Sequence, residues 1–456
     1  MSGAGLPDGR LLSWYGDDFT GSAAVMEVLS FGGLPSVLFL APPTETQLAR
    51  FPQARAVGIA GTARSRSPAW MDAHLPEIFA ALAALHSPIT HYKVCSTLDS
   101  APDIGSIGHA IDLAATALPS RWFPVLIAAP VMGRYQAFSN LFAASGDAVH
   151  RLDRHPVMRR HPVTPMHEAD IRLHLARQTQ AGIGGLELPQ LRSADGGDAA
   201  LAALLARGER IVTLDAVDAG DMAAAGRLMW QTRGSGLFAV GSQGVEYALL
   251  EHWRDAGLVD PVAAPSAAEP LDRIVVVSGS VSQTTADQIA WAAAHGFRAI
   301  AFDVASVVDP ARRDGAVSDA VRDSLRAVQE GQSPLIHTAL GPDDPAVPAL
   351  REAVARASLT TEDAFARIGT ALGDILDQVL DLSGLDRAVI SGGDTSGHAC
   401  AQLGIFALTA LAQTIPGATL CRAHRETGAG FELALKGGQM GSTDYFGWIR
   451  AGGGGR

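Results

Sequence analysis

The sequence predicts an α/β protein made of two α/β domains with mostly parallel sheets and a cleft between the domains. Two observations predict this class. Short apolar runs alternate with helix-like segments along the chain, which is typical of parallel sheets with helices on both faces. Residues 255–272 carry three prolines among alanines and separate two such series, as an interdomain linker does.

These patterns divide the chain into four parts. We expect a first domain at residues 1–255, a linker at 256–271 and a second domain at 272–448. Four consecutive glycines lie in the remaining residues, 449–456, and predict a frayed tail. A cleft between two domains is a common place for a small-molecule site.

The expected elements follow in chain order. A strand at 11–15 leads through the turn Gly16-Asp17-Asp18 to a helix that ends near Ser30. Further strands are expected at 37–40, 57–60, 89–94, 125–128, 211–214, 237–240, 274–277, 299–302, 335–337 and 388–390, and further helices at 71–85, 104–118 and 245–253. Thr164-Pro165 has the form of an N-cap and a first-turn proline, and it predicts another helix start.

Composition excludes several classes of protein. The 456 residues are 47% hydrophobic and 18% charged, which suffices for sizeable cores. The formal net charge is −12, whereas a nucleic-acid-binding surface needs a basic field. Three cysteines without CxxC spacing make no disulfide framework, and no apolar run reaches the roughly 18–20 residues that cross a bilayer. We expect a soluble, cytoplasmic protein with no nucleic-acid or membrane partner.

Lysine is rare in this chain. Only two of the 35 Lys and Arg residues are lysines, Lys93 and Lys436. A genome rich in G and C encodes arginine wherever any cation suffices. A remaining lysine therefore suggests a position that fits a compact ammonium and not a planar guanidinium.

Three polar segments of the first domain follow expected strands, where open α/β sheets bind ligands. Asp17 and Asp18 can accept sugar hydroxyls, hold Mg²⁺ or take a proton, although an acidic helix start is the structural alternative. The segment Lys93-Val94-Cys95-Ser96-Thr97-Leu98-Asp99-Ser100 suits a polyol acid, or is a Ser/Thr-rich turn. Arg134 and the basic residues of 151–161 suit a carboxylate, or form a solvated loop.

Three glycine-containing loops of the second domain suit phosphates. They are Ser278-Gly279-Ser280-Val281-Ser282, Ser391-Gly392-Gly393-Asp394-Thr395-Ser396-Gly397 and Lys436-Gly437-Gly438-Gln439-Met440-Gly441. Glycines let the backbone approach a phosphate, and a helix N-terminus attracts anions. Each loop alone is compatible with plain turn chemistry. Together they favour a nucleotide phosphate site, in which Lys436 can follow phosphoryl charge.

Other chemistries lack their patterns. G-x-S-x-G is absent, and no Ser/His/Asp set is visible. HExxH is absent too, and the six-residue spacing of His155, His161 and His167 gives no shared helix face, so we assign no metal ligand. Cys95 has no visible partner base and is expected to be a buried thiol.

In order and spacing, these motifs resemble the four-carbon acid sugar kinase family, over nearly the whole chain from Asp17-Asp18-Phe19-Thr20-Gly21 to residues 436–441. The resemblance implies a sugar-acid-binding N-terminal domain and a nucleotide-binding C-terminal domain. Cys95-Ser96-Thr97-Leu98-Asp99-Ser100 and His161-Pro162-Val163-Thr164-Pro165-Met166 are most similar to the 3-oxo-tetronate kinase branch. This implies ATP-dependent phosphorylation of the terminal 4-hydroxyl of a 3-oxo-tetronate, with domain closure over the reactants.

The resemblance also implies a role for each matching residue. The acid would be bound by Asp17, Asp18, Lys93, Ser96, Thr97, Asp99, Arg134 and His161. ATP would be held by Ser278, Ser280, Ser282, Gly392, Gly393, Asp394, Thr395, Lys436, Gly437, Gly438 and Gly441, with Mg²⁺ bridging its phosphates. Lys436 would act in catalysis, with Asp394 as the first candidate base and Asp18 as the second. A homodimer is left open.

Some residues depart from the family pattern. Gly437-Gly438-Gln439-Met440 replaces the more usual S/P-G-N/S-F, Asp394 stands where that branch can carry Glu, and Arg151-Leu152-Asp153-Arg154-His155-Pro156 is an additional basic segment. Three alternatives therefore stay open: a kinase for threonate or erythronate, a kinase for a branched 3-oxo acid such as 3-oxo-isoapionate, and a non-catalytic sensor of a sugar acid and a nucleotide.

Overall fold

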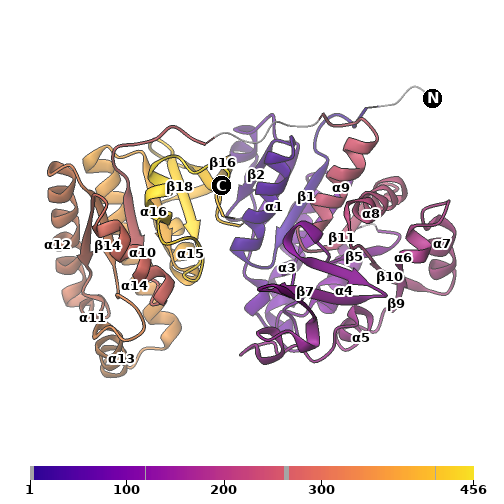
Figure 1. Ribbon diagram of the computed structural model, residues 1–456, viewed down its shortest axis with the longest axis horizontal. Coiled ribbons are helices and arrows are strands. Elements are labelled where there is room, and N and C mark those ends of the chain that lie inside the picture. The colour runs from indigo at the N-terminus through magenta and orange to yellow at the C-terminus, as the bar shows by residue number, and fades with distance from the viewer. Residues whose placement is uncertain (1–4, 119, 261–266, 416) are drawn as a thin grey trace. The chain divides into compact units, whose positions relative to one another are not determined.

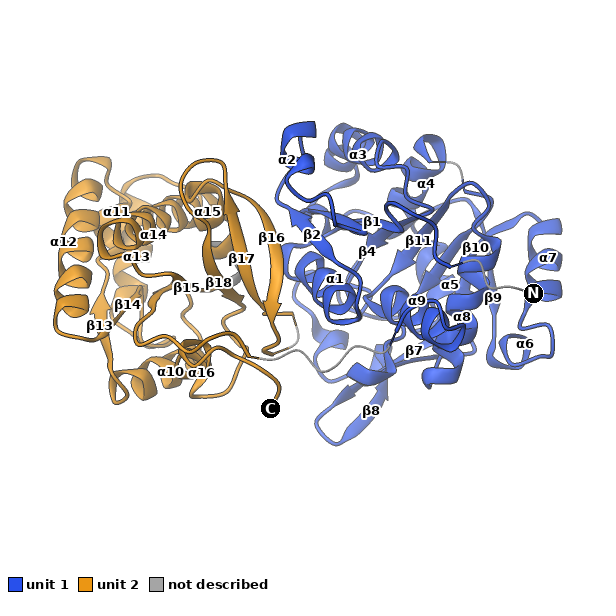
Figure 2. Cartoon of the chain, turned by 90° about the horizontal axis from the view of Figure 1, so that it is seen from above, with its two compact units in different colours: residues 1–263 blue, residues 264–456 orange. Residues whose placement is uncertain are grey.

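The computed structural model describes residues 5–118, 120–260, 267–415 and 417–456. The chain forms two compact units, Met1–Ala263 and Ala264–Arg456 (Figure 2). Helices and strands alternate along both units (Figure 1), which confirms the predicted α/β class. Residues 261–266 of the predicted linker lie outside the described residues.

A parallel sheet forms the centre of unit 1. From one edge to the other its strands are β2 (Ser36–Phe39), β3 (Ala56–Ala60), β1 (Leu12–Gly16), β4 (Ile89–Lys93), β11 (Leu237–Gly241), β5 (Phe123–Leu126), β10 (Glu209–Leu214) and β9 (Gly182–Leu186). Every neighbouring pair is parallel. β1, β4 and β11 are buried along their whole length, as strands covered on both faces are. The carboxyl ends of all these strands meet at one edge.

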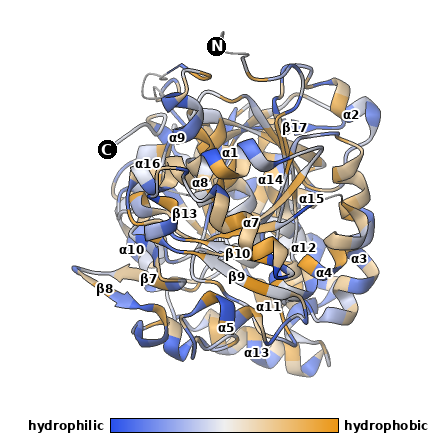
Figure 3. Cartoon of the chain, turned by 90° about the vertical axis from the view of Figure 1, so that its right-hand side faces the viewer, coloured by the Kyte–Doolittle hydropathy of each residue, from blue (hydrophilic) through white to orange (hydrophobic). Residues whose placement is uncertain are grey.

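Helices cover both faces of this sheet (Figure 2). On one face, α9 (Gly244–Asp255) packs against α1 (Phe19–Phe31) and α8 (Ala219–Thr232), and on the other α3 (Pro68–Ala83) packs against α4 (Ile107–Ala117). The buried residues of α3 recur every three or four positions, and the helix carries both hydropathy colours in Figure 3, as a helix with one buried face does. Shorter helices are α2 (Glu45–Ala49), α5 (Ile171–Leu175), α6 (Leu188–Leu191) and α7 (Asp198–Ala206).

A small antiparallel sheet, absent from the sequence prediction, lies between β5 and β9 in the chain. It consists of β6 (Arg134–Ala137), β7 (Asn140–Ser145) and β8 (Ala148–Arg151). The turn between β6 and β7 is Phe138-Ser139, and both residues have a left-handed φ, of 50° and 60°. Such turns are usually signalled by Asn or Gly, so this hairpin has no visible sequence signature.

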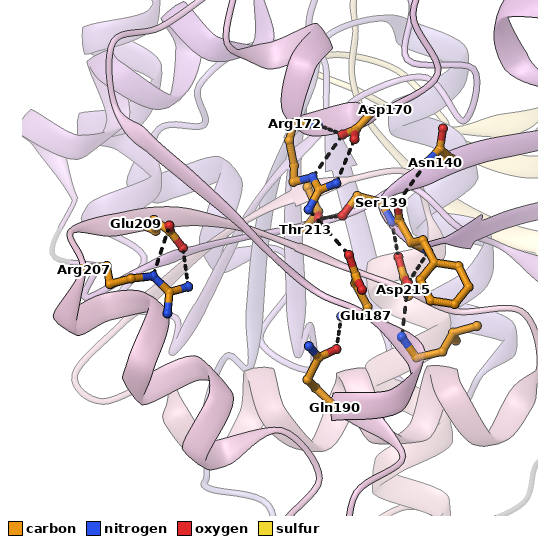
Figure 4. A network of polar contacts seen from close by, with 12 residues as sticks. Ser139, Asn140, Asp170, Arg172, Glu187, Gln190, Arg207, Glu209, Thr213 and Asp215 are labelled. Carbon is orange, nitrogen blue, oxygen red and sulfur yellow. Dashed lines mark hydrogen bonds and ion pairs between the residues drawn. The ribbon is translucent and has the colours of Figure 1, made fainter.

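The buried carboxylate of Asp215, directly after β10, stabilises that unusual turn (Figure 4). It accepts the backbone N–H groups of Phe138 at 2.5 Å and Ser139 at 2.9 Å, and also that of Leu188 at 3.2 Å. Burial raises the pKa of the Asp215 carboxyl above its ordinary value, while the N–H donors oppose that shift. The small sheet is thus attached to the carboxyl edge of the main sheet.

The sheet of unit 2 is parallel over five strands. Their order is β13 (Phe297–Ala301), β14 (Ser333–His337), β12 (Val275–Ser278), β15 (Arg387–Ser391) and β18 (Phe431–Lys436), followed by the antiparallel strands β17 (Leu420–Arg425) and β16 (Ile405–Ala412). β12 and β15 are buried throughout. The last three strands were not among those expected from the sequence.

Helices cover this sheet on both faces (Figure 2). One face carries α10 (Gln283–Ala293) and α16 (Tyr445–Arg450); the other carries α14 (Thr361–Ser383), which packs against α12 (Pro310–Gln329) and α15 (Gly393–Gln402). The remaining helices are α11 (Val304–Val307) and α13 (Ala346–Arg356). No helix within the described ranges is both long and apolar enough to cross a membrane.

The expectation of a frayed C-terminal tail is wrong. Gly452 accepts the backbone N–H of Ala268 at 2.9 Å, and Gly454 donates its own to Gln413 at 2.7 Å. A Cβ on Gly452, whose φ is +104°, would lie 1.9 Å from the Ala268 carbonyl oxygen. These glycines are therefore present because the chain packs too closely for a side chain.

The expectation of a helix that starts at Thr164-Pro165 is also wrong. The helix in this region, α5, begins at Ile171 and is capped by Asp170, which accepts the N–H of Arg172. The hydroxyl of Thr164 instead contacts His161 Nδ1 at 3.0 Å, and the N–H of Met166 is bonded to Met158. Competing local bonds thus hold the segment in a loop.

We predict that Asp215→Ala lowers the free energy of unfolding of unit 1 by about 3 kcal/mol, because it leaves three N–H groups without their acceptor. Urea unfolding followed by circular dichroism measures this change. Phe138→Gly is the control: it removes a side chain from a left-handed turn position and should gain up to about 1 kcal/mol. A loss below 1 kcal/mol for Asp215→Ala would contradict the anchoring role.

Candidate active site

The predicted acidic pair of unit 1 lies at the carboxyl end of β1. Asp18 is the N-cap of α1, and its Oδ1 accepts the N–H of Gly21 at 2.9 Å. Asp17 is 1% exposed. Asp18 thus has the structural role of an acidic helix start. Among the described residues, the buried Asp17 carboxylate caps no helix, and its hydrogen bonds go to Arg64.

Arg64, which the sequence analysis missed, pairs with both carboxylates. Its Nη2 lies 2.6 Å from Asp17 Oδ1 and 2.8 Å from Asp18 Oδ1. Burial raises the pKa of Asp17 to about 6, and the Arg64 charge limits that rise. The residue follows β3 at the same sheet edge, so extending the strand-end argument to the segment after 57–60 would have found it.

Lys93 ends β4 and pairs in register with Gly16 of β1. It is 2% exposed, and its Nζ donates to the Val94 carbonyl at 2.6 Å. A Cβ on Gly21 would lie 2.4 Å from Asp18 Oδ1 and 2.9 Å from Lys93 Nζ. The ammonium and the Asp18 carboxylate therefore both lie against Gly21, which places a cation beside the acidic pair.

The loop after Lys93 is held by its own polar side chains. Thr97 Oγ1 donates to Asp99 Oδ1 at 2.8 Å and lies 3.0 Å from Cys95 Sγ, while Ser96 is half-buried in the same loop. Burial raises the pKa of the Cys95 thiol, which is consistent with an inert thiol. Hydroxyl groups and a carboxylate thus follow the strand that carries the lysine.

Ser100 closes this loop onto α5. Its Oγ lies 2.8 Å from His174 Nε2 and accepts from Gln178 Nε2 at 3.0 Å. Burial lowers the pKa of His174 to about 4, so the ring is neutral at physiological pH. The contact is a buried structural one, because both side chains are at least nine-tenths shielded from solvent.

Arg134 and His161, the other predicted acid ligands, lie on the small sheet and the loop after it. Arg134 Nη1 donates to the carbonyls of Met132, Gly133 and Ala144 at 3.2–3.4 Å. His161 Nδ1 accepts the N–H of Thr164 at 3.0 Å, so the neutral ring carries its proton on Nε2. Within the described ranges, no hydrogen bond or ion pair joins either residue to Asp17, Asp18 or Lys93.

In unit 2 the predicted loops meet at the carboxyl edge of the sheet. Ser278 of β12, Ser391 of β15 and Lys436 of β18 are in register on neighbouring strands. The backbone links the loops that follow, since Gly279 donates to Ser391 and Gly392 to Lys436, both at 2.9 Å. Gly392 has a φ of +130° and precedes α15.

Ser282 and Thr285 bind the glycine loop after Lys436. Both hydroxyls donate to the Gly438 carbonyl, at 2.5 and 2.9 Å. A Cβ on Gly438 would lie 2.3 Å from Ser280 Oγ, and Gly441 has a φ of +88°. Glycine at these positions is thus a requirement of packing and of backbone conformation.

Lys436 is the second buried lysine of the chain. It is 2% exposed, and its Nζ donates to the Gly437 carbonyl at 3.1 Å and to Thr285 Oγ1 at 3.3 Å. Burial lowers its pKa to about 8. No carboxylate pairs with this ammonium in the described residues, so its charge is available to an anion.

A pocket of about 240 Å³ lies beside these loops. Its lining joins residues of the loops (Gly279, Ser280, Gly392 and Gly438) to apolar side chains (Val304, Val347, Leu350, Phe365 and Ile368). The apolar wall comes from α11, α13 and α14, which the sequence analysis did not expect as helices. It can cover a flat apolar group next to a phosphate site.

Three of the predicted nucleotide-binding residues are only partly described. The backbone of Gly393, Asp394 and Thr395 forms the first turn of α15, while their side chains lie outside the described part of the structure. Among the side chains that are described, no cluster of three or more His, Cys, Asp or Glu could hold a metal ion.

Comparisons with known proteins match the two units separately. Residues 12–249 match a family described as a sugar-binding N-terminal domain, and residues 275–446 match one described as a nucleotide-binding C-terminal domain. These matches define a two-domain protein that binds a sugar and a nucleotide. The chain belongs to the four-carbon acid sugar kinase family.

Relatives cover nearly its full length. A 3-oxo-isoapionate kinase from Paraburkholderia graminis is 47% identical, over 98% of this chain and 95% of the relative. A 3-oxo-tetronate kinase from Pseudomonas fluorescens is 32% identical, over 96% and 95%. A crystal structure from Salmonella typhimurium LT2 is 26% identical and superposes with a TM-score of 0.77, over 96% of this chain and 98% of that one.

Gly21→Ala tests the close approach of Asp18 and Lys93. Alanine normally stabilises a helix relative to glycine by about 0.5–1 kcal/mol. Here we expect the reverse, a lower melting temperature of unit 1, because the added Cβ would clash with both charged groups. The matched control is Gly315→Ala, at an exposed position of α12 with open space around it, which should raise the stability of unit 2. Equal behaviour of the two variants would contradict the packing at Gly21.

Proposed function

We propose that this protein is an ATP-dependent kinase that phosphorylates the terminal hydroxyl of a 3-oxo sugar acid. The placement of its only two lysines carries the proposal. Lys93 is buried beside the carboxylates and hydroxyls of the sugar-binding domain, and Lys436 is buried beside the glycine loops of the nucleotide-binding domain. One cation serves the carboxylate of the acid, and the other serves the phosphates of ATP.

On the nucleotide side, the apolar wall of the pocket takes the adenine ring, and the loops after β12, β15 and β18 take the phosphates. Ser278, Ser280, Ser282, Gly392 and Gly438 supply hydroxyls and closely approaching backbone there. Lys436 then follows the charge that develops during phosphoryl transfer. In this assignment Gly393, Thr395, Gly437 and Gly441 complete the same loops.

Mg²⁺ is the ion expected with ATP, and it would neutralise charge on the phosphates. Because no described cluster of acidic or histidine side chains forms a cage, the nucleotide itself would hold most of the ion's coordination. Asp394 and the serine hydroxyls are the protein groups that would complete it. Asp394 also stays our first candidate for the base that accepts the hydroxyl proton, and Asp18 the second.

On the acid side, the carboxylates of Asp17, Asp18 and Asp99 accept hydrogen bonds from the hydroxyls of the acid, and the Thr97 hydroxyl is a further partner for them. We assign Lys93 to its carboxylate, with Arg134 and the Nε2–H of His161 as further donors. Ser96 belongs to the same loop. The polar but uncharged stretch of Ser96 and Thr97 suits a substrate with several hydroxyl groups.

Two acids are candidates for the substrate. A branched acid of the 3-oxo-isoapionate kind ranks first, because the relative named for it is 47% identical. The 3-oxo-tetronate implied by the segment from Cys95 to Ser100 ranks second, since relatives named for it reach 32%. The sensor alternative falls behind both, because these relatives are named kinases.

A coupled ADP-release assay tests the proposal. Purified protein with ATP and Mg²⁺ is offered each acid, made in situ from its hydroxy acid by a dehydrogenase, with threonate and erythronate as controls. We expect turnover on the 3-oxo acids, with kcat/KM for the branched acid at least tenfold higher. Turnover only on threonate or erythronate would reject the 3-oxo assignment, and ATP binding without turnover would favour the sensor.

The pH dependence of ATP affinity tests the role of Lys436. Its ammonium is charged below a pKa of about 8 and neutral above it, so raising the pH from 7.5 to 9.5 should weaken ATP binding about tenfold or more. Titration calorimetry measures this. Lys436→Met should bind weakly at both pH values and lose the dependence. Lys93→Met, which removes the other buried lysine, should leave ATP affinity unchanged; if it does not, the assignment of the two lysines is wrong.

A further inference from the structure

Arg64 makes more contacts with the acidic pair than any residue assigned from the sequence. Its Nη2 bridges Asp17 Oδ1 at 2.6 Å and Asp18 Oδ1 at 2.8 Å, and its Nε reaches Asp17 Oδ2 at 3.3 Å. One guanidinium thus binds Asp17 with two nitrogens and Asp18 with one of them. A lysine could not form this fork, because its charge sits on a single nitrogen.

Backbone contacts fix the position of Arg64. The Arg64 N–H donates to the Asp17 carbonyl at 2.9 Å, which ties the turn after β3 to the turn after β1. On the other side Gly105, with a φ of +59°, lies so close that a Cβ there would be 2.4 Å from the Arg64 carbonyl oxygen. The side chain therefore starts from a defined position beside the carboxylates.

The surroundings of Asp17 explain why a cation is needed there. The charged and titratable groups that face it are Arg64, Asp18, Lys93, Tyr15 and Tyr92. Two neighbouring carboxylates in a buried place favour sharing a proton unless a cation opposes it. Lys93 contributes, but its Nζ is bonded to the Val94 carbonyl, whereas Arg64 contacts both acids directly and cannot lose its proton.

We propose that Arg64 is the positioning residue of the acid site, whose guanidinium holds Asp17 and Asp18 side by side as carboxylates. This rests on the proposed function only in that the two aspartates serve the sugar acid. Arg64 itself transfers no proton. It keeps both aspartates as hydrogen-bond acceptors and fixes Asp18 Oδ1, which also caps α1, so that the Asp18 carboxylate has one orientation.

Two readouts with opposite pH trends test this in the full-length protein. In Arg64→Gln the Asp17 carboxyl should ionise at higher pH, so the acid limb of kcat/KM, expected near pH 6 in the unchanged protein, should move up by at least one pH unit. The loss of activity at pH 6 should then exceed the loss at pH 8 about tenfold. Arg64→Lys, which keeps the charge without the fork, should show a smaller shift.

The second readout is thermal unfolding between pH 5 and pH 8, which does not depend on turnover. When folding raises the pKa of an aspartate, that group contributes its full stabilisation at a pH below its pKa in the unfolded state, about 3.9. The contribution is lost as the pH rises through the pKa in the folded state. Without Arg64 the pKa of Asp17 in the folded protein should be higher still. The melting temperature of Arg64→Gln should therefore lie below that of the unchanged protein by a larger margin at pH 8 than at pH 5.

Arg207→Gln is the matched control, because Arg207 pairs with Glu209 at an exposed site shown in Figure 4. It should move neither readout. A uniform loss of activity and melting temperature at all pH values in Arg64→Gln would overturn the proposal and leave a structural role. Absence of turnover in the unchanged protein would reject the proposed function, while the melting temperatures would still decide the role of Arg64.

Discussion

Both candidate sites depend on one constraint: parallel strands bring their carboxyl ends to the same edge of a sheet. In unit 1 this pairs Gly16 with Lys93, so the acidic turn after β1 meets the lysine of β4. In unit 2 it sets Ser278, Ser391 and Lys436 in register. A shift of one residue in any of these pairings would turn the side chain to the other face of the sheet, since successive side chains alternate.

The second constraint is the burial of charge. Lys93 and Lys436 are both 2% exposed, and each ammonium is bonded to the carbonyl of the residue that follows it. Such neutral partners offset part of the cost of burial without cancelling the charge, which leaves each cation able to bind an anion. The buried charge of Asp17 is stabilised in another way, because it forms an ion pair with Arg64. The carboxyl edge of the sheet in unit 1 thus carries a lysine beside an acidic pair that an arginine neutralises, whereas the described residues at that edge in unit 2 give Lys436 no carboxylate partner.

The sequence pattern predicted well where a signal is local. The strands expected at 11–15 and 89–94 are found, within one residue at each end, at Leu12–Gly16 and Ile89–Lys93. The pattern failed where the cause is distant. Phe138 lies in a left-handed turn, and its N–H is bonded to Asp215, which is far along the chain. Gly452 looks like a flexible tail residue, yet a carbonyl of Ala268 packs against it. The apolar pocket wall comes from helices that carry no chemical motif.

The α/β class and the two groups of polar segments follow from the order of residues alone, because periodicity, turn residues and rare lysines are local features of the chain. The family was indicated by the resemblance of the ordered motifs to a known family. Only folding decides which of those segments meet. It brings Arg64, one arginine among many, onto Asp17 and Asp18, and it holds Arg134 and His161 in contacts of their own. The strand-end argument can place Arg64 at the same sheet edge as the two aspartates, but register and loop packing between residues far apart in the chain decide which side chains there make contact.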